Sequence, residues 1–469
     1  MKTRIEHDLL GEKEVPADAY YGIQTLRGIE NFQNISGITI GDYPNYVKAL
    51  AMVKWAAAKA NQELEILPDD IANAITRACE EIIGGKLHDQ FPVDLIQGGA
   101  GTSTNMNINE VVANRALELM GHQKGEYQYC HPNNHVNMSQ STNDAYPTSF
   151  KLAFIFMNEE LVADLKLLIQ AFRAKGEEFK EVLKMGRTQL QDAVPMTMGQ
   201  EFEAFAANLE EEVDRLNQMA KLFLEVNMGA TAIGTGINSE PEYSSKCIKN
   251  LRIISGEEFV LASNLIEATP DAGSSVMYSS ALKRLAVKLS KICNDLRLLS
   301  SGPRCGLNEI LPPMQPGSSI MPGKVNPVIP EVVNQICYRI IGNDLTVTFA
   351  AEAGQLQLNV MEPVMVHAIF SSIKMLQKGM DRLRILCVEG ITANTQHCRE
   401  MVLNSIGIVT ALNPTLGYEN SSRIAKRALK ENRSVYDLVL EEGLLTKDEL
   451  DQLLKPESMI KPHKFYKKK

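Results

Sequence analysis

The chain has 469 residues, 44% hydrophobic and 22% charged, which is the composition of a folded globular protein and excludes a disordered chain. Its 48 Lys and Arg against 57 Asp and Glu leave a net charge of −9 at pH 7, which argues against nucleic acid as a partner. Neither a signal peptide nor an apolar run of the roughly 20 residues that span a membrane is visible, so no membrane association is expected. Eight scattered cysteines without a C-x-x-C pair predict reduced thiols in the cytoplasm.

Residues 1–141 are predicted to form a first, mostly helical domain. This region mixes short helices with connections that are rich in Gly and Asn. Two polar breaks lie at its end, G-G-A-G-T-S-T-N at residues 98–105 and S-Q-S-T-N-D at residues 139–144.

Residues 142–394 are predicted to form a central bundle of long helices. Apolar residues recur at steps of three and four over residues 154–172, 202–223 and 282–299, which is the period of a helix. Two further helices are expected at residues 330–350 and 364–388. These segments are long and apolar on more than one face, so we expect them to pack against each other and against copies of the same chain.

Residues 395–469 are predicted to form a small C-terminal helical domain. The long helical period ends near Asn394, and turn signals follow at Asn413-Pro414 and at Gly417. The predicted class is therefore mainly all-α, in three domains.

Two more polar breaks interrupt the central helices, at residues 186–192 and 317–327. Ser, Thr, Asn and Gly also begin and end helices, so each of the first three breaks can be a simple helix cap. The fourth, G-S-S-I-M-P-G-K-V-N-P, is too long and too rich in functional groups for a turn that only reverses the chain. Together the breaks offer hydroxyls, carboxamides, backbone N–H groups and one Lys, which are donors for an anion. The sequence predicts no metal-ligand cluster.

The segment at residues 317–327 resembles the signature loop of the aspartase/fumarase superfamily, and the other three breaks resemble its remaining conserved regions in order and spacing. The resemblance covers essentially the whole chain. It implies a three-domain, mainly α-helical fold and a homotetramer with a core of long helices. It also implies active sites that combine residues from three subunits.

Within the superfamily, the chain most closely resembles the bacterial aspartate ammonia-lyases. That branch converts L-aspartate reversibly to fumarate and ammonia, by removal of a proton from Cβ through an enediolate. The resemblance implies no cofactor, and a divalent cation as an activator only.

Carried over position by position, the resemblance implies roles for ten residues. The implied base is Ser318, acting as an alkoxide. The residues implied to hold the carboxylate that becomes the enediolate are Thr102, Ser141, Thr142 and, through its backbone N–H, Ser319. Those implied to hold the other carboxylate are Thr188, Lys324 and Asn326. Those implied to contact the amino group are Asn143 and Gln189.

Two alternatives remain open at this point. A class II fumarate hydratase would use the same scaffold, but fumarases have His where this chain has Gln189 and tend to have Ser where it has Thr142. An alkylammonium leaves with its proton and needs hydrogen-bond acceptors, which a Gln carbonyl supplies, whereas water chemistry benefits from a titrating His. The other alternative is a non-catalytic structural protein of the same fold, in which Ser318 or Lys324 should have been lost.

Overall fold

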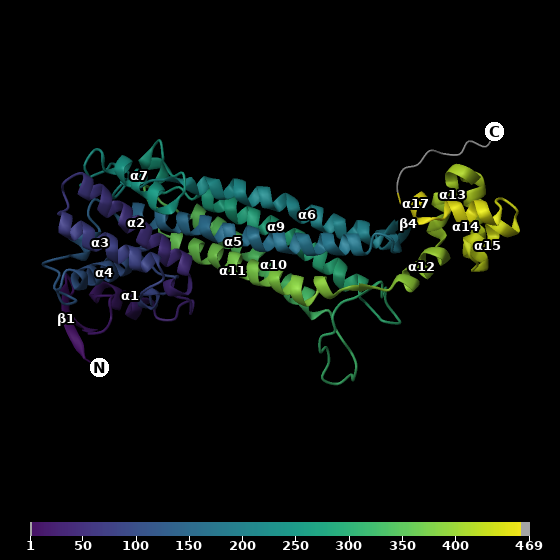
Figure 1. Cartoon of the computed structure of the whole chain (residues 1–469), viewed down its shortest axis with the longest axis horizontal. Coiled ribbons are helices and arrows are strands. Elements are labelled where there is room, and N and C mark those ends of the chain that lie inside the picture. The colour runs from purple at the N-terminus through teal and green to yellow at the C-terminus, as the bar shows by residue number, and fades with distance from the viewer. Residues whose placement is uncertain (1, 461–469) are drawn as a thin grey trace. The chain divides into compact units, whose positions relative to one another are not determined.

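The computed structural model describes residues 2–460 and is mainly helical, as predicted (Figure 1). The described strands form two-stranded sheets. Three pairs are antiparallel: β1 (Thr3–Asp8) with β2 (Gly11–Pro16), β3 (Leu183–Thr188) with β4 (Gln191–Thr197), and β7 (Ile310–Leu311) with β8 (Thr392–Ala393). One pair is parallel, β5 (Glu225–Val226) with β6 (Val260–Leu261). Within residues 2–460, no helix is both long and apolar enough to cross a membrane.

Five long helices confirm the predicted apolar stripes. They are α5 (Thr142–Glu178), α6 (Met198–Ala220), α9 (Gly273–Leu299), α10 (Val328–Glu352) and α11 (Glu362–Leu386). The longest has 37 residues and the shortest 23.

The chain divides into two compact units, and each of the five long helices contributes a segment to both. The first unit comprises residues 1–162, 214–284 and 338–375, and the second comprises residues 163–213, 285–337 and 376–469. This division follows compactness and does not test the predicted domain bounds at 141 and 394, which stay a prediction. Residues 461–469 of the predicted third domain lie outside the described residues.

The first unit contains the N-terminal helices. They are α1 (Ile23–Phe32), α2 (Pro44–Glu63), α3 (Asp69–Ile83), α4 (Thr102–Leu119), α7 (Tyr243–Ser255) and α8 (Leu265–Ala268). Its shorter turns are η1 (Ile40–Asp42), η2 (His88–Gln90), η3 (Pro132–Val136) and η4 (Lys221–Leu224). An aromatic cluster lies in its core, where the ring of Phe154 contacts the rings of Phe223, Tyr278 and Phe370.

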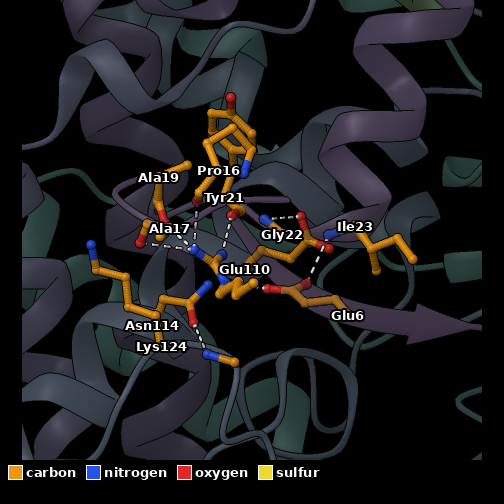
Figure 2. A network of polar contacts seen from close by, with 12 residues as sticks. Glu6, Pro16, Ala17, Ala19, Tyr21, Gly22, Ile23, Glu110, Asn114 and Lys124 are labelled. Carbon is orange, nitrogen blue, oxygen red and sulfur yellow. Dashed lines mark hydrogen bonds and ion pairs between the residues drawn. The ribbon is translucent and has the colours of Figure 1, made fainter. Parts of the chain in front are cut away.

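A buried carboxylate joins α1 to α4 in this unit. Glu110 of α4 accepts the backbone N–H groups of Gly22 at 2.8 Å and Gln24 at 2.8 Å, which lie at the start of α1. Figure 2 shows Glu110 and Glu6 facing the backbone of Gly22 and Ile23. Because the first N–H groups of a helix have no partner within it, these carboxylates satisfy them and fix α1 against α4.

The second unit combines bundle segments with the C-terminal helices. Phe202 packs against Phe172 and Phe179 where α6 meets α5. The C-terminal helices are α12 (Thr395–Asn404), α13 (Val409–Leu416), α14 (Tyr418–Glu431), α15 (Val435–Glu441), α16 (Lys447–Leu453) and α17 (Pro456–Met459), with turns η5 (Val388–Gly390) and η6 (Ile406–Ile408). They enclose an apolar core together with Leu183 and Met185 of β3.

Candidate active site

The ten predicted site residues fall into both units. The first unit contains Thr102, Ser141, Thr142 and Asn143; the second contains Thr188, Gln189, Ser318, Ser319, Lys324 and Asn326.

The break at residues 98–105 is a left-handed turn that leads into α4. Gly99, Ala100 and Gly101 all have positive φ, and α4 begins at Thr102. A Cβ on Gly101 would lie 2.5 Å from the ring of Tyr146, so only glycine fits there. The turn is thus a helix start, and it also leaves the Thr102 side chain exposed beside the first N–H groups of the helix.

The break at residues 139–144 begins α5, which confirms the cap that its composition predicted. Ser141 Oγ accepts the backbone N–H of Asn143 at 3.2 Å, and Asp144 accepts that of Ser141 at 3.0 Å. The buried Asp144 also accepts the N–H of Thr231 at 2.8 Å, and burial raises the pKa of its carboxyl group to about 7. The buried carboxylate of Asp144 therefore holds the start of α5 in place through these backbone N–H groups. The side chains of residues 141–143 remain partly exposed.

Asn143 uses part of its hydrogen-bonding capacity within the protein. Its Nδ2 donates to the carbonyl of Ala232 at 2.7 Å, and its own carbonyl accepts from Asn227 at 3.0 Å. These bonds hold the first turn of α5 against residues 227–232. The predicted contact of Asn143 with an amino group stays a prediction.

A buried lysine that the sequence analysis missed lies behind these residues. Lys54 of α2 is 1% exposed, and its Nζ donates to carboxamide oxygens of Asn105 at 2.7 Å, Gln140 at 2.8 Å and Asn137 at 3.1 Å. Asn105 donates in turn to Thr142 Oγ1 at 3.2 Å. Burial lowers the pKa of Lys54 to about 7. The one signal in the sequence is a lysine inside the apolar run A-M-V-K-W-A-A-A.

The break at residues 186–192 is a β-hairpin, so the prediction of a helix cap is wrong for this segment. Thr188 pairs with Gln191 at the end of β3 and β4, and the two turn residues, Gln189 and Leu190, have φ values of +54° and +62°. Two consecutive residues with positive φ are typical of the tight turn that suits the twist of a hairpin. Thr188 and Gln189 are therefore presented at an exposed tip.

The segment at residues 317–327 is a loop that is closed at its neck. Asn326 Nδ2 donates to the carbonyl of Gly317 at 2.7 Å, and a Cβ on Gly317 would lie 2.6 Å from Asn326 Cγ. Asn326, predicted to bind a carboxylate, thus uses one amide hydrogen within the loop. Ser319 and Lys324 are exposed beyond the neck, and Gly323 has a φ of +76° in the turn before Lys324.

Ser318 accepts two hydrogen bonds from the backbone of its own loop. The donors are the N–H groups of Met321 at 2.9 Å and Ile320 at 3.3 Å, and both point at Oγ. Donors aimed at an oxygen stabilise it most when it carries negative charge. This geometry fits a serine that acts as a base.

Comparison with known proteins places the chain in a family. A family model described as Lyase matches residues 11–342, and one described as Fumarase C C-terminus matches residues 408–461. Among curated relatives, the chain is 63% identical to an aspartate ammonia-lyase of Pseudomonas aeruginosa over 98% of this chain and 97% of that protein. It is 59% identical to the aspartate ammonia-lyase of Helicobacter pylori, over 99% of this chain and 100% of that protein.

Solved structures agree. The fumarate lyase:delta crystallin from Brucella melitensis bound to cobalt superposes with a TM-score of 0.95 at 55% identity, covering 98% of this chain and 100% of that one. A class II fumarase from Schistosoma mansoni superposes with a TM-score of 0.91 at 34% identity, covering 99% and 100%. The chain therefore belongs to the aspartase/fumarase superfamily of lyases.

Proposed function

We infer that the chain is a carbon–nitrogen lyase that converts L-aspartate reversibly to fumarate and ammonia. The observation that carries this inference is the identity of 59% to 63% with aspartate ammonia-lyases over nearly the full length of both proteins. Identity to the class II fumarase is 34%, so the fumarate hydratase alternative is disfavoured. Ser318 and Lys324 are both present, which also disfavours a purely structural protein.

The difficult step is removal of a proton next to a carboxylate, because the resulting enediolate carries two negative charges. Ser318 takes the Cβ proton as an alkoxide. The two backbone N–H groups that point at its Oγ support this role because they favour the charged form of the hydroxyl.

Hydroxyl donors stabilise the enediolate. Thr102, Ser141, Thr142 and the N–H of Ser319 hold its carboxylate in this proposal. One preorganised donor of this kind contributes roughly 3 kcal/mol to transition-state stabilisation. Lys324, Asn326 and Thr188 hold the other carboxylate, which keeps its charge throughout.

The contacts to the leaving nitrogen distinguish an amino-acid substrate from a hydroxy acid. Asn143 and Gln189 contact the amino group of aspartate in this proposal. An ammonium group leaves with its proton, so carboxamide oxygens are sufficient partners for it. Gln189, at the exposed hairpin tip, supplies one such oxygen.

We propose that the active form is a homotetramer in which the ten residues meet between copies of the chain. Support comes from α10, on which Tyr338, Leu345 and Phe349 are 57%, 55% and 65% exposed. They lie at helical spacing on one apolar stripe, and an exposed stripe of that kind marks an interface.

We propose that the reaction needs no cofactor, that a divalent cation is an activator only, and that the protein works in the cytoplasm. The leaving group departs as ammonia without help from a Lewis acid. All eight cysteines are free thiols, which supports a reducing compartment. Activity should therefore survive exhaustive dialysis against a chelator.

A direct competition assay tests the activity. The purified protein is offered L-aspartate or L-malate, and fumarate is followed by absorbance while ammonia is measured separately. We expect equal amounts of fumarate and ammonia from aspartate. Turnover of malate without turnover of aspartate would reject the proposal.

A further inference from the structure

A cluster of charged side chains, of which Glu309 and Lys184 are buried, lies behind the hairpin that carries Thr188 and Gln189. At its centre is Glu309, which is completely buried. Its Oε1 accepts from Arg187 Nη1 at 2.6 Å, and its Oε2 lies 3.0 Å from Lys184 Nζ. Lys184 also pairs with Glu201, and Asp192 Oδ1 lies 4.0 Å from Arg187 Nε at the edge of the cluster.

The carboxylate of Glu309 projects from a fixed backbone. The N–H of Glu309 donates to the carbonyl of Leu299 at 2.8 Å, and its own carbonyl accepts from Asn394 at 2.9 Å. The next residue begins β7, which pairs with β8. Because its backbone is fixed, the carboxylate of Glu309 can hold a neighbouring segment in place through ion pairs.

The segment that it holds is β3. Lys184 and Arg187 both lie on this strand, and Thr188 follows Arg187 directly. Between the two cations the strand has a bulge at Gly186, where a Cβ would lie 2.9 Å from the carbonyl of Val194. The bulge lets two residues three apart reach the same carboxylate.

The side chains around Arg187 leave unfilled space beside it. Its side chain lines a cavity of about 340 Å³ beside α12 and a second of about 190 Å³ beside α9. At the base of the hairpin, Leu183 and Met185 of β3 pack into the apolar core of the C-terminal helices, whereas beyond Gly186 the strand borders these cavities. The direction of the hairpin tip then depends on the charge cluster.

We propose that Glu309 is a positioning residue for the reaction: through Arg187 and Lys184 it sets the place of Thr188 and Gln189. This inference rests on the proposed function, in which those two residues bind aspartate. Thr188 binds the carboxylate that keeps its charge throughout, and Gln189 binds the amino group, which is still attached when the Cβ proton is removed, so both contacts are made before that step. Loosening them removes uniform binding, which raises KM and leaves kcat nearly unchanged.

The test uses Glu309→Gln in the full-length protein. The substitution keeps the size of the side chain but removes its charge and turns an amide N–H₂ group toward a cation. We expect KM for aspartate to rise at least about tenfold, with kcat reduced less than about threefold. Arg187→Lys keeps the charge but loses the guanidinium that reaches Glu309 through Nη1, and should raise KM by a smaller factor.

The matched control is Glu212→Gln. Glu212 is also completely buried in the same unit, and it pairs with Lys288 Nζ at 2.6 Å, joining α6 to α9 rather than holding the hairpin. Its substitution should lower the thermal midpoint as Glu309→Gln does and change KM less than about twofold.

Equal KM changes in the Glu309 and Glu212 variants, or a loss confined to kcat, would overturn the inference. If Glu309→Gln does not fold, the KM of Arg187→Lys decides. Failure of the proposed function would be seen separately, because the unsubstituted protein would then release no ammonia from aspartate.

Discussion

Lys54 donates from Nζ to Oδ1 of Asn105 at 2.7 Å inside the first unit. Asn105 follows Thr102 by one turn of α4 and donates to Thr142 at the start of α5. A single buried lysine thus ties together the two helix starts that present Thr102, Ser141 and Thr142. Three carboxamide oxygens accept from its amino group, which offsets the cost of burying that polar group.

Lys54→Met should damage both stability and activity. The substitution leaves the oxygens of Asn105 and Gln140 without their buried donor, which costs about 2 to 4 kcal/mol in the free energy of unfolding. We expect kcat/KM for aspartate to fall at least about tenfold, because Thr142 loses its fixed neighbour. Lys59→Met on the same helix is the control, since Lys59 is only partly buried and bonds Gln62 alone. Unchanged kinetics in Lys54→Met would contradict the role.

Gly101→Ala should misplace Thr102. The new Cβ would meet the ring of Tyr146 at 2.5 Å in a backbone with a φ of +85°. Gly121→Ala is the matched control, because Gly121 has a φ of +86° and open space around it. Both variants carry the same backbone strain of about 1 kcal/mol. We expect kcat for aspartate to fall at least about tenfold in Gly101→Ala alone, and equal kinetics in the two variants would refute the explanation.

The long helices could be predicted because their apolar residues repeat with the helical period over about five turns or more. The β3–β4 hairpin could not. Its alternation is broken by the bulge at Gly186, and its two turn residues are Gln189 and Leu190 rather than the Asn-Gly or Asp-Gly that normally signals such a turn. The pairing of Thr188 with Gln191 on either side holds both in a backbone conformation that their own preferences disfavour.

The candidate site shows a similar division. Residues such as Ser318 and Lys324 stand in a contiguous motif, so the sequence alone singles them out. Their supporting residues do not. Lys54 meets oxygens from residues 105, 137 and 140, and Glu309 meets Arg187 from 122 positions away. Contacts between residues so far apart in the sequence leave neither a periodic pattern nor a local motif. These residues could therefore be identified only from the three-dimensional structure.

Ser318→Ala should abolish turnover while leaving substrate binding intact. Loss of the base removes general base catalysis, worth about 10³-fold or more in kcat. The hydroxyl also accepts two loop N–H groups, so Ser318→Thr, which keeps an acceptor, serves as a control for loop shape. Binding of succinate, followed by calorimetry, should stay within about threefold of the unsubstituted protein in Ser318→Ala. A near-normal kcat would remove Ser318 from its proposed role.

Mixing two inactive variants tests whether the site forms between copies. Thr102→Val and Ser318→Ala each inactivate every site of a homotetramer. If one copy supplies residue 102 and another supplies residue 318, exchange of subunits restores about a quarter of the sites. Activity should therefore appear after mild dissociation and reassociation of the mixture. A mixture that stays inactive, while reassociated unsubstituted protein recovers, would show that both residues come from one copy.

Glu362 should make stability depend on pH. This carboxyl group is buried at the start of α11, and burial raises its pKa from 4.5 to about 8, although Lys151 acts in the opposite direction. Between those two values the folded chain keeps a proton that the unfolded chain has lost. The folded state therefore binds more protons, and its stability falls as the pH rises through this window.

Glu362→Gln removes this proton linkage while keeping the shape of the side chain. The quantity compared is the free energy of unfolding of Glu362→Gln minus that of the unsubstituted protein. This difference should be at least about 2 kcal/mol more positive at pH 8 than at pH 5. Thermal midpoints of both proteins, measured in half-unit steps from pH 5 to pH 8.5, give the comparison directly. Glu159→Gln, on an exposed position of α5, is the control and should leave the pH profile unchanged. Parallel profiles for Glu362→Gln and the unsubstituted protein would mean that this carboxyl group titrates alike in the folded and unfolded chains.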